Sequence, residues 1–376
     1  MSASVNSKAP RVALVCDWLV IEGGAERVLK CLHDLFPEAP IFTLVYDAQK
    51  APAWCRECDV RTTYVQRWPG AKSHYRLLLP FMPRAWEALD LMEFDLVVSL
   101  CSSCCKGVLT RPDAAHVCFC HTPTRYVWDL YYDYLSTAGT VKRAIMPRLI
   151  HKVRQWDFQA AQRVDCFVAN SDYVGRRIKK YYHRDSLTIH PGTIIPPAPV
   201  SAKHGDYYLV VSRFVGYKRV DLAIQACDLL GRRLVVVGSG GNEEARLHRM
   251  AGSTVEFAGH ASDEELHGWY DGARALLFPG VEDFGLVPVE AMAHGCPVLA
   301  YGAGGALETV VDGETGLFFC EQTPEALAAC IEQFEAREFS ATACRKRAGE
   351  FSEEKFKREM AAFCEDALTD AAGGKQ

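Results

Sequence analysis

The sequence predicts an α/β protein made of two Rossmann-like domains, and three observations support this fold class. The 376 residues are enough for two domains with a large buried core. Apolar runs that resemble strands alternate with helical stretches, as in a parallel sheet covered on both faces. This pattern starts again after a proline-rich stretch, Pro191-Gly-Thr-Ile-Ile-Pro-Pro-Ala-Pro-Val-Ser201, which is typical of a linker.

The expected elements and domain limits follow from this repeated pattern. Strand-like runs occupy residues 11–16, 41–46, 95–99, 116–120 and 166–170, and then 207–212, 234–237, 255–259, 275–278 and 297–301. We therefore place one domain at residues 1–195 and a second at 196–352. An amphipathic helix at 353–368 is a candidate to pack back on the first domain, and we expect the tail at 369–376 to be disordered.

Composition argues against several classes of protein. The formal net charge of −5 gives no reason to expect a nucleic-acid partner. No run of about 18 apolar residues occurs, so we expect no membrane-spanning helix. The first ten residues are polar and lack the apolar core of a secretory signal, which favours a cytoplasmic location.

The chain has sixteen cysteines, which is a high number for its length. Cys101, Cys104, Cys105, Cys118 and Cys120 together resemble a set of metal ligands. Cys118 and Cys120, however, alternate within a strand-like run, as buried side chains do. We therefore expect reduced thiols that pack as small apolar side chains, and no metal site.

The most informative run is Glu282-Asp-Phe-Gly-Leu-Val-Pro-Val-Glu290, which follows a strand-like segment. Pro288 suits the first turn of a helix, so Glu282 is expected on a loop and Glu290 in the first helical turn. Carboxylates accept hydrogen bonds from hydroxyl groups. One acidic residue near a helix start is ordinarily explained by the helix dipole, but two around a glycine turn favour a binding site.

Backbone amides at the same helix start add hydrogen-bond donors to this site. The amides of Phe284, Gly285 and Leu286 are expected to point at the ligand and to bind its oxygens. Donors and carboxylates together suit a ligand that is rich in hydroxyl and phosphate groups.

Two cations in the second domain form the next candidate. Arg213 and Lys218 are five residues apart in the loop after the strand at 207–212, and two fixed cations can neutralise a diphosphate. Most such pairs are ordinary surface charges, but the nearby Glu282 and Glu290 favour a site. No Asp-x-Asp pair stands where it could carry Mg²⁺ between phosphates, so we expect no metal and no other cofactor.

The first domain carries two further candidates. Gly23 and Gly24 follow the first strand, where glycine lets the backbone approach a phosphate closely. This pair is a weak signal, and it lacks the three-glycine spacing of a dinucleotide site. His121 begins the run His121-Thr-Pro-Thr-Arg-Tyr-Val-Trp128 directly after a strand, at the edge where parallel sheets bind ligands.

Together these motifs resemble the retaining glycosyltransferases of family four, which have the GT-B fold, with two Rossmann-like domains facing each other across a cleft. The similarity spans most of the chain and is strongest at 13–27, 120–128 and 211–319. The segment at 120–128 is similar to bacterial mannosyltransferases of polysaccharide assembly. The resemblance therefore implies a GDP-mannose donor, although no single residue fixes the base or the sugar.

The resemblance also implies a role for each candidate residue. In the first domain, Gly23 and Gly24 would lie against the donor phosphates, and His121 would contact the transferred sugar. In the second domain, Arg213 and Lys218 would bind the diphosphate, and His260 would lie beside the base. Glu282 would face the donor sugar, and Glu290 would bind the ribose. His121, Arg213, Lys218 and Glu282 would be the catalytic groups. Members of this family retain the anomeric configuration, and front-face attack fits a site with no obvious carboxylate nucleophile.

The acceptor is expected to be a glycan or a lipid-linked oligosaccharide. Two segments, 61–84 and 142–154, are basic and rich in aromatic or apolar residues. They could lie on an anionic membrane surface, or they could form solvated faces whose apolar side packs on the core, and the sequence supports both equally. The protein would then be cytoplasmic, either free or on the inner face of the membrane.

Four other functions remain open: a transferase that uses a UDP-sugar, a dehydrogenase, a sugar-nucleotide epimerase and a sugar-binding protein without catalysis. A dehydrogenase needs a full glycine fingerprint and an acidic residue about 20 positions later. Gly238-Ser-Gly-Gly241 is the nearest match and lacks that partner. A sugar-binding protein would need no diphosphate clamp, and an epimerase would turn over without an acceptor.

Overall fold

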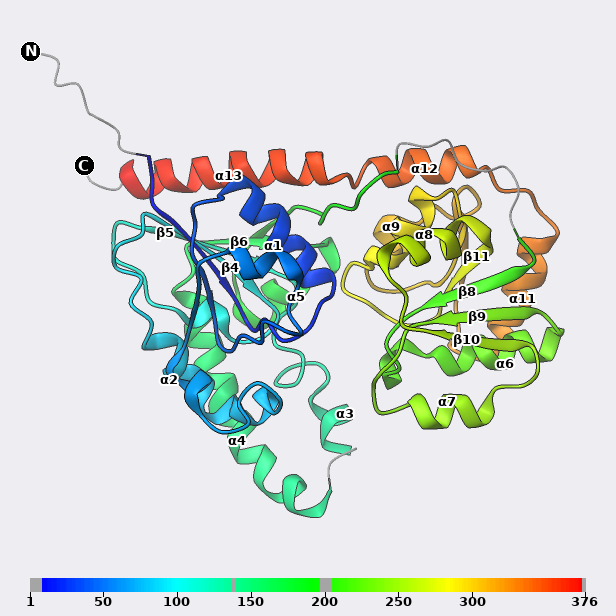
Figure 1. The fold of residues 1–376 in the computed structure, drawn as a ribbon, viewed down its shortest axis with the longest axis horizontal. Coiled ribbons are helices and arrows are strands. Elements are labelled where there is room, and N and C mark those ends of the chain that lie inside the picture. Colours follow the sequence, from blue (N-terminus) through cyan, green and yellow to red (C-terminus); the bar gives the residue numbers. More distant parts are fainter. Residues whose placement is uncertain (1–8, 137–138, 197–204, 374–376) are drawn as a thin grey trace, which may run out of the picture. The chain divides into compact units, whose positions relative to one another are not determined.

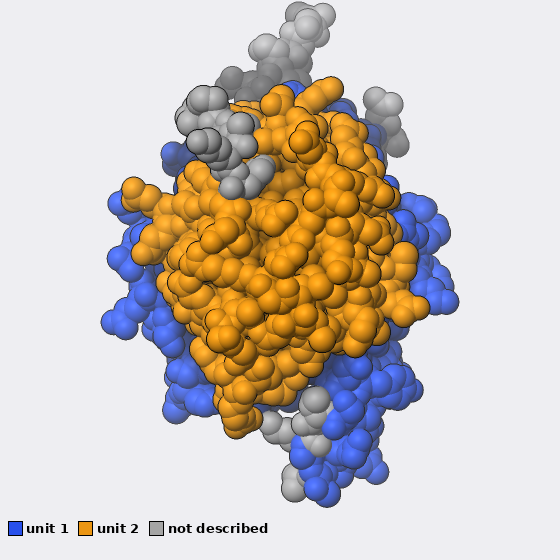
Figure 2. Space-filling model, turned by 90° about the vertical axis from the view of Figure 1, so that its right-hand side faces the viewer, with its two compact units in different colours: residues 1–189, 357–376 blue, residues 190–356 orange. Residues whose placement is uncertain are grey.

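The computed structural model describes residues 9–136, 139–196 and 205–373, and the chain divides into two compact units (Figures 1 and 2). Unit 1 comprises residues 1–189 and 357–376, and unit 2 comprises residues 190–356. The boundary therefore precedes the one that we expected at 195. The reason is that the amide of Thr193 donates to the carbonyl of Phe351 at 2.9 Å, which ties this segment to unit 2. The later part of the expected linker, residues 197–201, lies outside the described residues.

Unit 1 contains one sheet of seven parallel strands in the order β3-β2-β1-β4-β5-β6-β7. The strands are β1 (Val12–Cys16), β2 (Ile41–Thr43), β3 (Val60–Thr62), β4 (Leu96–Cys101), β5 (Ala115–Cys120), β6 (Cys166–Ala169) and β7 (Ser186–Thr188). Its helices are α1 (Gly24–Leu35), α2 (Met82–Glu87), α3 (Tyr131–Ser136), α4 (Thr140–Gln162) and α5 (Asp172–Tyr182), with short 3₁₀ helices η1 (Ala53–Glu57), η2 (Tyr64–Arg67), η3 (Tyr75–Phe81) and η4 (Cys105–Gly107).

Unit 2 contains a sheet of six parallel strands in the order β10-β9-β8-β11-β12-β13. The strands are β8 (Tyr207–Val211), β9 (Arg233–Val237), β10 (Val255–Gly259), β11 (Ala273–Phe278), β12 (Val298–Tyr301) and β13 (Gly316–Phe319). The helices are α6 (Val220–Leu230), α7 (Glu244–Met250), α8 (Asp263–Gly272), α9 (Leu286–Ala293), α10 (Ala306–Thr309), α11 (Pro324–Glu335) and α12 (Ala341–Gly349), with the 3₁₀ helix η5 (Gly216–Lys218).

Helices cover both faces of each sheet, as the alternating pattern predicts. In unit 2, Val210 and Val236 face a core formed with α6 and α11, whereas Leu209 and Val235 face a second core formed with α9 and α12. The strands β4 and β5 of unit 1 are buried along their whole length. Strands covered on both sides are accordingly continuous apolar runs rather than alternating ones.

The C-terminal helix α13 (Glu353–Gly373) corrects one expectation. Residues 369–373, which we expected to be disordered, continue this helix, and residues 374–376 lie outside the described part of the chain. From Lys357 onward the helix belongs to unit 1. Lys357 Nζ donates to Asp34 Oδ2 on α1 at 2.8 Å, and Figure 1 shows α13 running beside α1.

The cysteines behave as small core residues. All sixteen are free, and all except Cys58, Cys166 and Cys320 are buried. Among the described helices, none is both long enough and apolar enough to cross a membrane.

The order of the strands identifies one edge of each sheet as the place for a ligand. In unit 1 the strands are first added on one side of β1, and the chain then crosses to β4 on its other side, so the order of addition reverses between β1 and β4. In unit 2 it reverses in the same way between β8 and β11. In open parallel sheets, ligands bind beyond the carboxyl ends of the strands at this switch point. The loops that follow these four strands are therefore the places to examine.

Candidate functional site

The loop after β8 carries the two predicted cations of unit 2. Arg213 is exposed and forms no ion pair with any described residue. Lys218 ends η5 and forms an ion pair with Glu282 Oε1 from the loop after β11. The structure thus brings together Lys218, which is predicted to bind phosphate, and Glu282, which is predicted to bind the sugar, at the switch point of unit 2.

A glycine makes this approach of the two loops possible. Gly280 lies just after β11, and a Cβ atom there would stand 2.8 Å from the carbonyl oxygen of Tyr217 and 2.9 Å from Lys218 Cα. Real Cβ atoms do not approach other heavy atoms so closely. Gly280 therefore allows the Lys218 loop to pack against the start of the Glu282 loop.

Helix α9 begins after a turn that only glycine adopts easily. Gly285 is its N-cap residue at φ 84°, Phe284 packs into the core, and Pro288 lies in the first turn. The helix ends at Ala293, and Gly295 follows at φ 76°. Within the described residues, the amides of Phe284, Gly285 and Leu286 donate no hydrogen bond, so these predicted donors are available.

Glu290 has a partner that the sequence did not reveal. Tyr270, which is buried at the end of α8, donates its hydroxyl hydrogen bond to Glu290 Oε2 at 2.9 Å. The tyrosine ring is stacked on His294, whose Nδ1 lies 2.8 Å from Asp271 Oδ1. Tyr270 therefore orients the carboxylate of Glu290. Because α9 begins at Leu286, Glu290 lies in the second turn of the helix and not in the first turn, where we expected it. The predicted base-side residue, His260, is exposed directly after β10.

In unit 1, the predicted glycine loop begins α1. Gly23 is the N-cap residue and Gly24 the first residue of the helix. The carboxylate of Glu26 is close: its Oε2 would lie 3.3 Å from a Cβ atom at Gly23. Negative charge beside the loop suits sugar hydroxyl groups better than phosphates, so the phosphate-side role of Gly23 and Gly24 stays a prediction.

Asp17 locks together the two loops at the switch point of unit 1. Its carboxylate accepts hydrogen bonds from four successive amides, those of residues 102–105, at 2.7–2.9 Å. Burial raises the pKa of Asp17 to about 6, and the amide hydrogen bonds oppose this rise. The sequence offered no signal for Asp17 beyond its position after a strand.

His121 lies near the glycine loop. Its amide donates to the carbonyl of Cys101 at 2.9 Å, and its own carbonyl accepts from Asn170 Nδ2 at 3.0 Å. A hollow at this edge is lined by Cys16, Asp17, Trp18, Leu19, Ala25, Glu26, Leu29, Leu100, Ser102 and His121. The structure thus brings His121 and the start of α1 to one hollow of unit 1.

Among the residues that the structure describes, one group of side chains has the spacing of a metal site. Asp17, Cys101 and Cys105 present ligand atoms within 4.8 Å of one another, and all three are buried. Both oxygens of Asp17 are occupied by amides, and Cys105 donates to the carbonyl of Leu100 at 3.1 Å. These existing bonds explain the cluster without an ion.

Two protein-family models match consecutive parts of the chain. The model described as Glycosyltransferase Family 4 matches residues 22–196, and the model described as Glycosyl transferases group 1 matches residues 193–351. The chain belongs to glycosyltransferase family 4. The two matches correspond closely to the two Rossmann-like units, so the resemblance inferred from the motifs is confirmed.

Curated relatives agree with this family. Human alpha-1,3/1,6-mannosyltransferase ALG2 is 28% identical over 364 residues, which cover 83% of this glycosyltransferase and 84% of the relative. The mouse ALG2 protein is 25% identical over a similar span.

Solved structures confirm the GT-B fold of this glycosyltransferase. Sucrose-phosphate synthase from Thermosynechococcus elongatus superposes with a TM-score of 0.72 at 18% identity, covering 96% of this chain and all of that one. Anabaena HepE in complex with UDP-glucose superposes with a TM-score of 0.68 at 18% identity, covering 94% and 99%.

Proposed function

We propose that this glycosyltransferase moves mannose from GDP-mannose, with retention of configuration, to a glycan or lipid-linked oligosaccharide in cell-surface polysaccharide synthesis. The observation that carries the proposal is the meeting of Lys218 and Glu282 at the switch point of unit 2, near the amides that begin α9. A cation, a carboxylate and free amides at one edge match a diphosphate joined to a sugar.

Each group of this edge then has a task. Arg213 and Lys218 hold the diphosphate, and Glu290 accepts hydrogen bonds from the ribose hydroxyl groups. Glu282 and the amides of Phe284 to Leu286 hold the hydroxyl groups of the sugar. His260 lies beside the base. From unit 1, His121 contacts the transferred sugar, and Gly23 with Gly24 approaches the donor.

The reaction breaks the bond between the anomeric carbon and the donor phosphate oxygen, and forms a bond from that carbon to an acceptor hydroxyl. Negative charge develops on the leaving diphosphate, where the fixed cations Arg213 and Lys218 stabilise it. The leaving phosphate oxygen takes the proton of the acceptor hydroxyl on the same face of the sugar, which retains the configuration. A covalent glycosyl adduct trapped on Glu282 would contradict this mechanism.

The donor has one specific alternative. Similarity to a mannosyltransferase over most of the chain supports mannose. A structural neighbour was solved with UDP-glucose, but at 18% identity this likeness shows the fold alone and does not bear on the donor. We therefore favour GDP-mannose.

We propose that the protein meets a lipid-linked acceptor at an anionic membrane surface. Leu77 and Phe81 of η3 are exposed, as are Lys72 and Arg76 in the same stretch of sequence, and Ile145 is exposed on α4. Apolar and basic side chains mixed in this way suit a surface of anionic lipids. Exchange of Arg67, Lys72 and Arg76 together for alanine should weaken binding to anionic vesicles, and unchanged binding would retire this part of the proposal.

Release of the nucleoside diphosphate tests the function directly. The protein is mixed with GDP-mannose, with and without mannose-terminated oligosaccharides, and free GDP and the extended glycan are measured. We expect release that increases with acceptor. Binding without release would indicate a sugar-binding protein, and a converted nucleotide sugar without acceptor would indicate an epimerase.

A further inference from the structure

A fully buried ion pair lies behind the candidate residues of unit 1. Lys106 on η4 pairs with Asp157 on α4, and their side chains are 1% and 0% exposed. Burial by itself would lower the pKa of Lys106, but the Asp157 carboxylate and nearby thiols raise it well above its usual value. Lys106 therefore stays charged, and Asp157 is its counter-ion.

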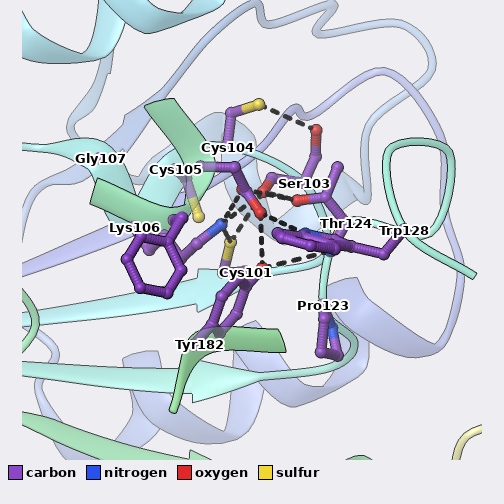
Figure 3. A network of polar contacts seen from close by, with 12 residues as sticks. Cys101, Ser103, Cys104, Cys105, Lys106, Gly107, Pro123, Thr124, Trp128 and Tyr182 are labelled. Atoms are coloured by element: carbon purple, nitrogen blue, oxygen red, sulfur yellow. Dashed lines mark hydrogen bonds and ion pairs between the residues drawn. The ribbon is translucent and has the colours of Figure 1, made fainter. Parts of the chain in front are cut away.

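Asp157 joins this cation to the segment that begins with His121. Its Oδ1 lies 2.9 Å from Thr124 Oγ1, and its Oδ2 accepts from Trp128 Nε1 at 2.8 Å and from the Tyr182 hydroxyl at 2.9 Å. Figure 3 shows the labelled side chains of Lys106, Thr124, Trp128 and Tyr182 converging on one centre.

The same network reaches the loop that is bound to Asp17. The carbonyl of Ser103 accepts from Lys106 Nζ at 3.1 Å and lies 2.6 Å from Thr124 Oγ1. The amide of Ser103 in turn donates to Asp17 at 2.8 Å. An unbroken chain of polar contacts therefore links the loops that follow β1, β4 and β5.

Stability alone does not explain such a pair. Desolvation of two charges offsets most of their attraction, and well-packed apolar residues of similar size are often as stable. Unlike apolar packing, the ion pair fixes a geometry, because Asp157 accepts hydrogen bonds from three elements in set directions.

We propose that Asp157 and Lys106 are positioning residues for the transferase reaction: they hold the Ser102–Cys105 loop and the His121–Trp128 segment so that His121 meets the transferred sugar. This inference rests on the proposed function, since it gives His121 a role in catalysis. Neither residue touches the substrate, and both act through the segment that they hold.

Two variants test the positioning role of Asp157 and Lys106: one removes a single hydrogen bond, and the other replaces the whole ion pair by apolar side chains. Tyr182→Phe removes one hydrogen bond to Asp157. Lys106→Met combined with Asp157→Leu replaces the pair by apolar side chains, so that no unpaired charge is left buried. The matched control is Tyr208→Phe, which removes the bond of an equally buried tyrosine hydroxyl to Glu335 in unit 2, 2.9 Å long.

The readout is kcat and KM for nucleoside diphosphate release, with the nucleotide sugar that the wild-type protein uses best. We expect kcat to fall about 10–100-fold for the double variant and less for Tyr182→Phe, because small displacements of a reacting geometry are costly. GDP affinity, which belongs to unit 2, should change less than about twofold. Tyr208→Phe should keep the wild-type kcat.

A double-mutant cycle with His121→Ala separates positioning from general damage. If Asp157 and Lys106 act through His121, their replacement should cost little more once His121 is gone. Wild-type kcat in the folded double variant, or losses that add to those of His121→Ala, would overturn the inference. If His121→Ala itself turned over normally, the role of His121 in the proposed function would fail as well.

Discussion

Lys218 and Glu282 connect the two loops of unit 2 that the proposal assigns to the donor. Their ion pair is only partly exposed, at 15% and 20% for the two side chains. The diphosphate and sugar of a donor offer the same two groups new partners, a phosphate for the cation and hydroxyl groups for the carboxylate. Under the proposed function, donor binding would therefore replace the Lys218–Glu282 ion pair by contacts to the donor.

Loss of either cation should slow transfer strongly. Lys218→Ala and Arg213→Ala should each remove about 2–4 kcal/mol of transition-state stabilisation, which is about a 30- to 1,000-fold loss of turnover. Steady-state rates of GDP release measure this loss. Arg233→Ala serves as control, because Arg233 is exposed and pairs with Asp206 and Glu256 instead. Wild-type rates for both variants would remove the two cations from the site.

Removal of the Tyr270 hydroxyl should weaken nucleotide binding. Tyr270→Phe removes one hydrogen bond that fixes the direction of the Glu290 carboxylate, so affinity for GDP should fall by about 1 kcal/mol, or about fivefold. Calorimetric titration with GDP measures the change. Tyr207→Phe, which removes a 2.8 Å bond to the carbonyl of Trp269, should leave this affinity unchanged. Equal affinities for both variants would mean that Glu290 does not need this contact.

Sequence reasoning named the candidate acids, cations and glycines but none of the residues that orient them in the structure. Tyr270, Asp17, Lys106 and Asp157 contact their partners across long stretches of chain; Lys106 and Asp157 are 51 positions apart. Each stands in a segment with an ordinary helical or loop pattern, so no local signal marked it. Only the fold reveals which buried polar groups meet.

At the scale of elements, the paired loops depend on close backbone packing. Gly280→Ala should place a methyl group against the Tyr217 carbonyl and displace the loop that carries Lys218. We expect destabilisation of about 1–3 kcal/mol together with weaker GDP binding. Gly268→Ala in α8 is the matched control: it meets nothing within 4 Å and should be neutral or stabilising. Unchanged GDP binding in Gly280→Ala would show that the loops do not need this approach.

Strand β5 contains a histidine that should make stability depend on pH. His116 is 1% exposed, its Nε2 lies 2.9 Å from Ser99 Oγ, and burial lowers its pKa to about 4. Because the folded pKa is below the unfolded value of about 6.5, the fold favours the neutral ring. Its contribution is complete above pH 6.5 and is lost as the pH falls towards 4.

The comparison of wild type with His116→Gln measures this contribution. Between pH 7 and pH 4.5, wild-type unit 1 should lose about 2–3 kcal/mol more unfolding free energy than the variant, as followed by urea unfolding. Parallel pH profiles would show that His116 does not titrate as its burial requires.

Most strands and helices were predictable because buried parallel strands are continuous apolar runs. Helix starts also carry recognisable signals: Ser262 and Glu265 form a capping box at α8, and the Thr323 side chain caps α11. The edge strands β3 and β7, of three residues each, and β13 were missed. Gly316 begins β13 and resembles a turn residue, yet a Cβ atom there would lie 1.9 Å from the carbonyl of Val298 on β12, so only glycine fits.

At the scale of the whole molecule, two units of the same strand order carry different chemistry. Unit 2 offers Arg213, Lys218 and free amides at its switch point, which suits a nucleoside diphosphate. Unit 1 offers the Glu26 carboxylate and His121 at its hollow, which suit hydroxyl groups, whereas the Asp17 carboxylate is occupied by the amides of the loop after β4.

The decisive measurement is a panel of nucleotide sugars tested by thermal shift, because a ligand that binds the folded protein raises its melting temperature, by an amount that grows with the logarithm of ligand concentration over Kd. Wild type and Lys218→Ala are compared with GDP-mannose, GDP, UDP-glucose and free mannose. We expect GDP-mannose and GDP to raise the melting temperature of the wild-type protein, and to raise that of Lys218→Ala much less. No shift with any nucleotide sugar, or equal shifts for both proteins, would contradict the proposed donor site at Lys218 and Glu282.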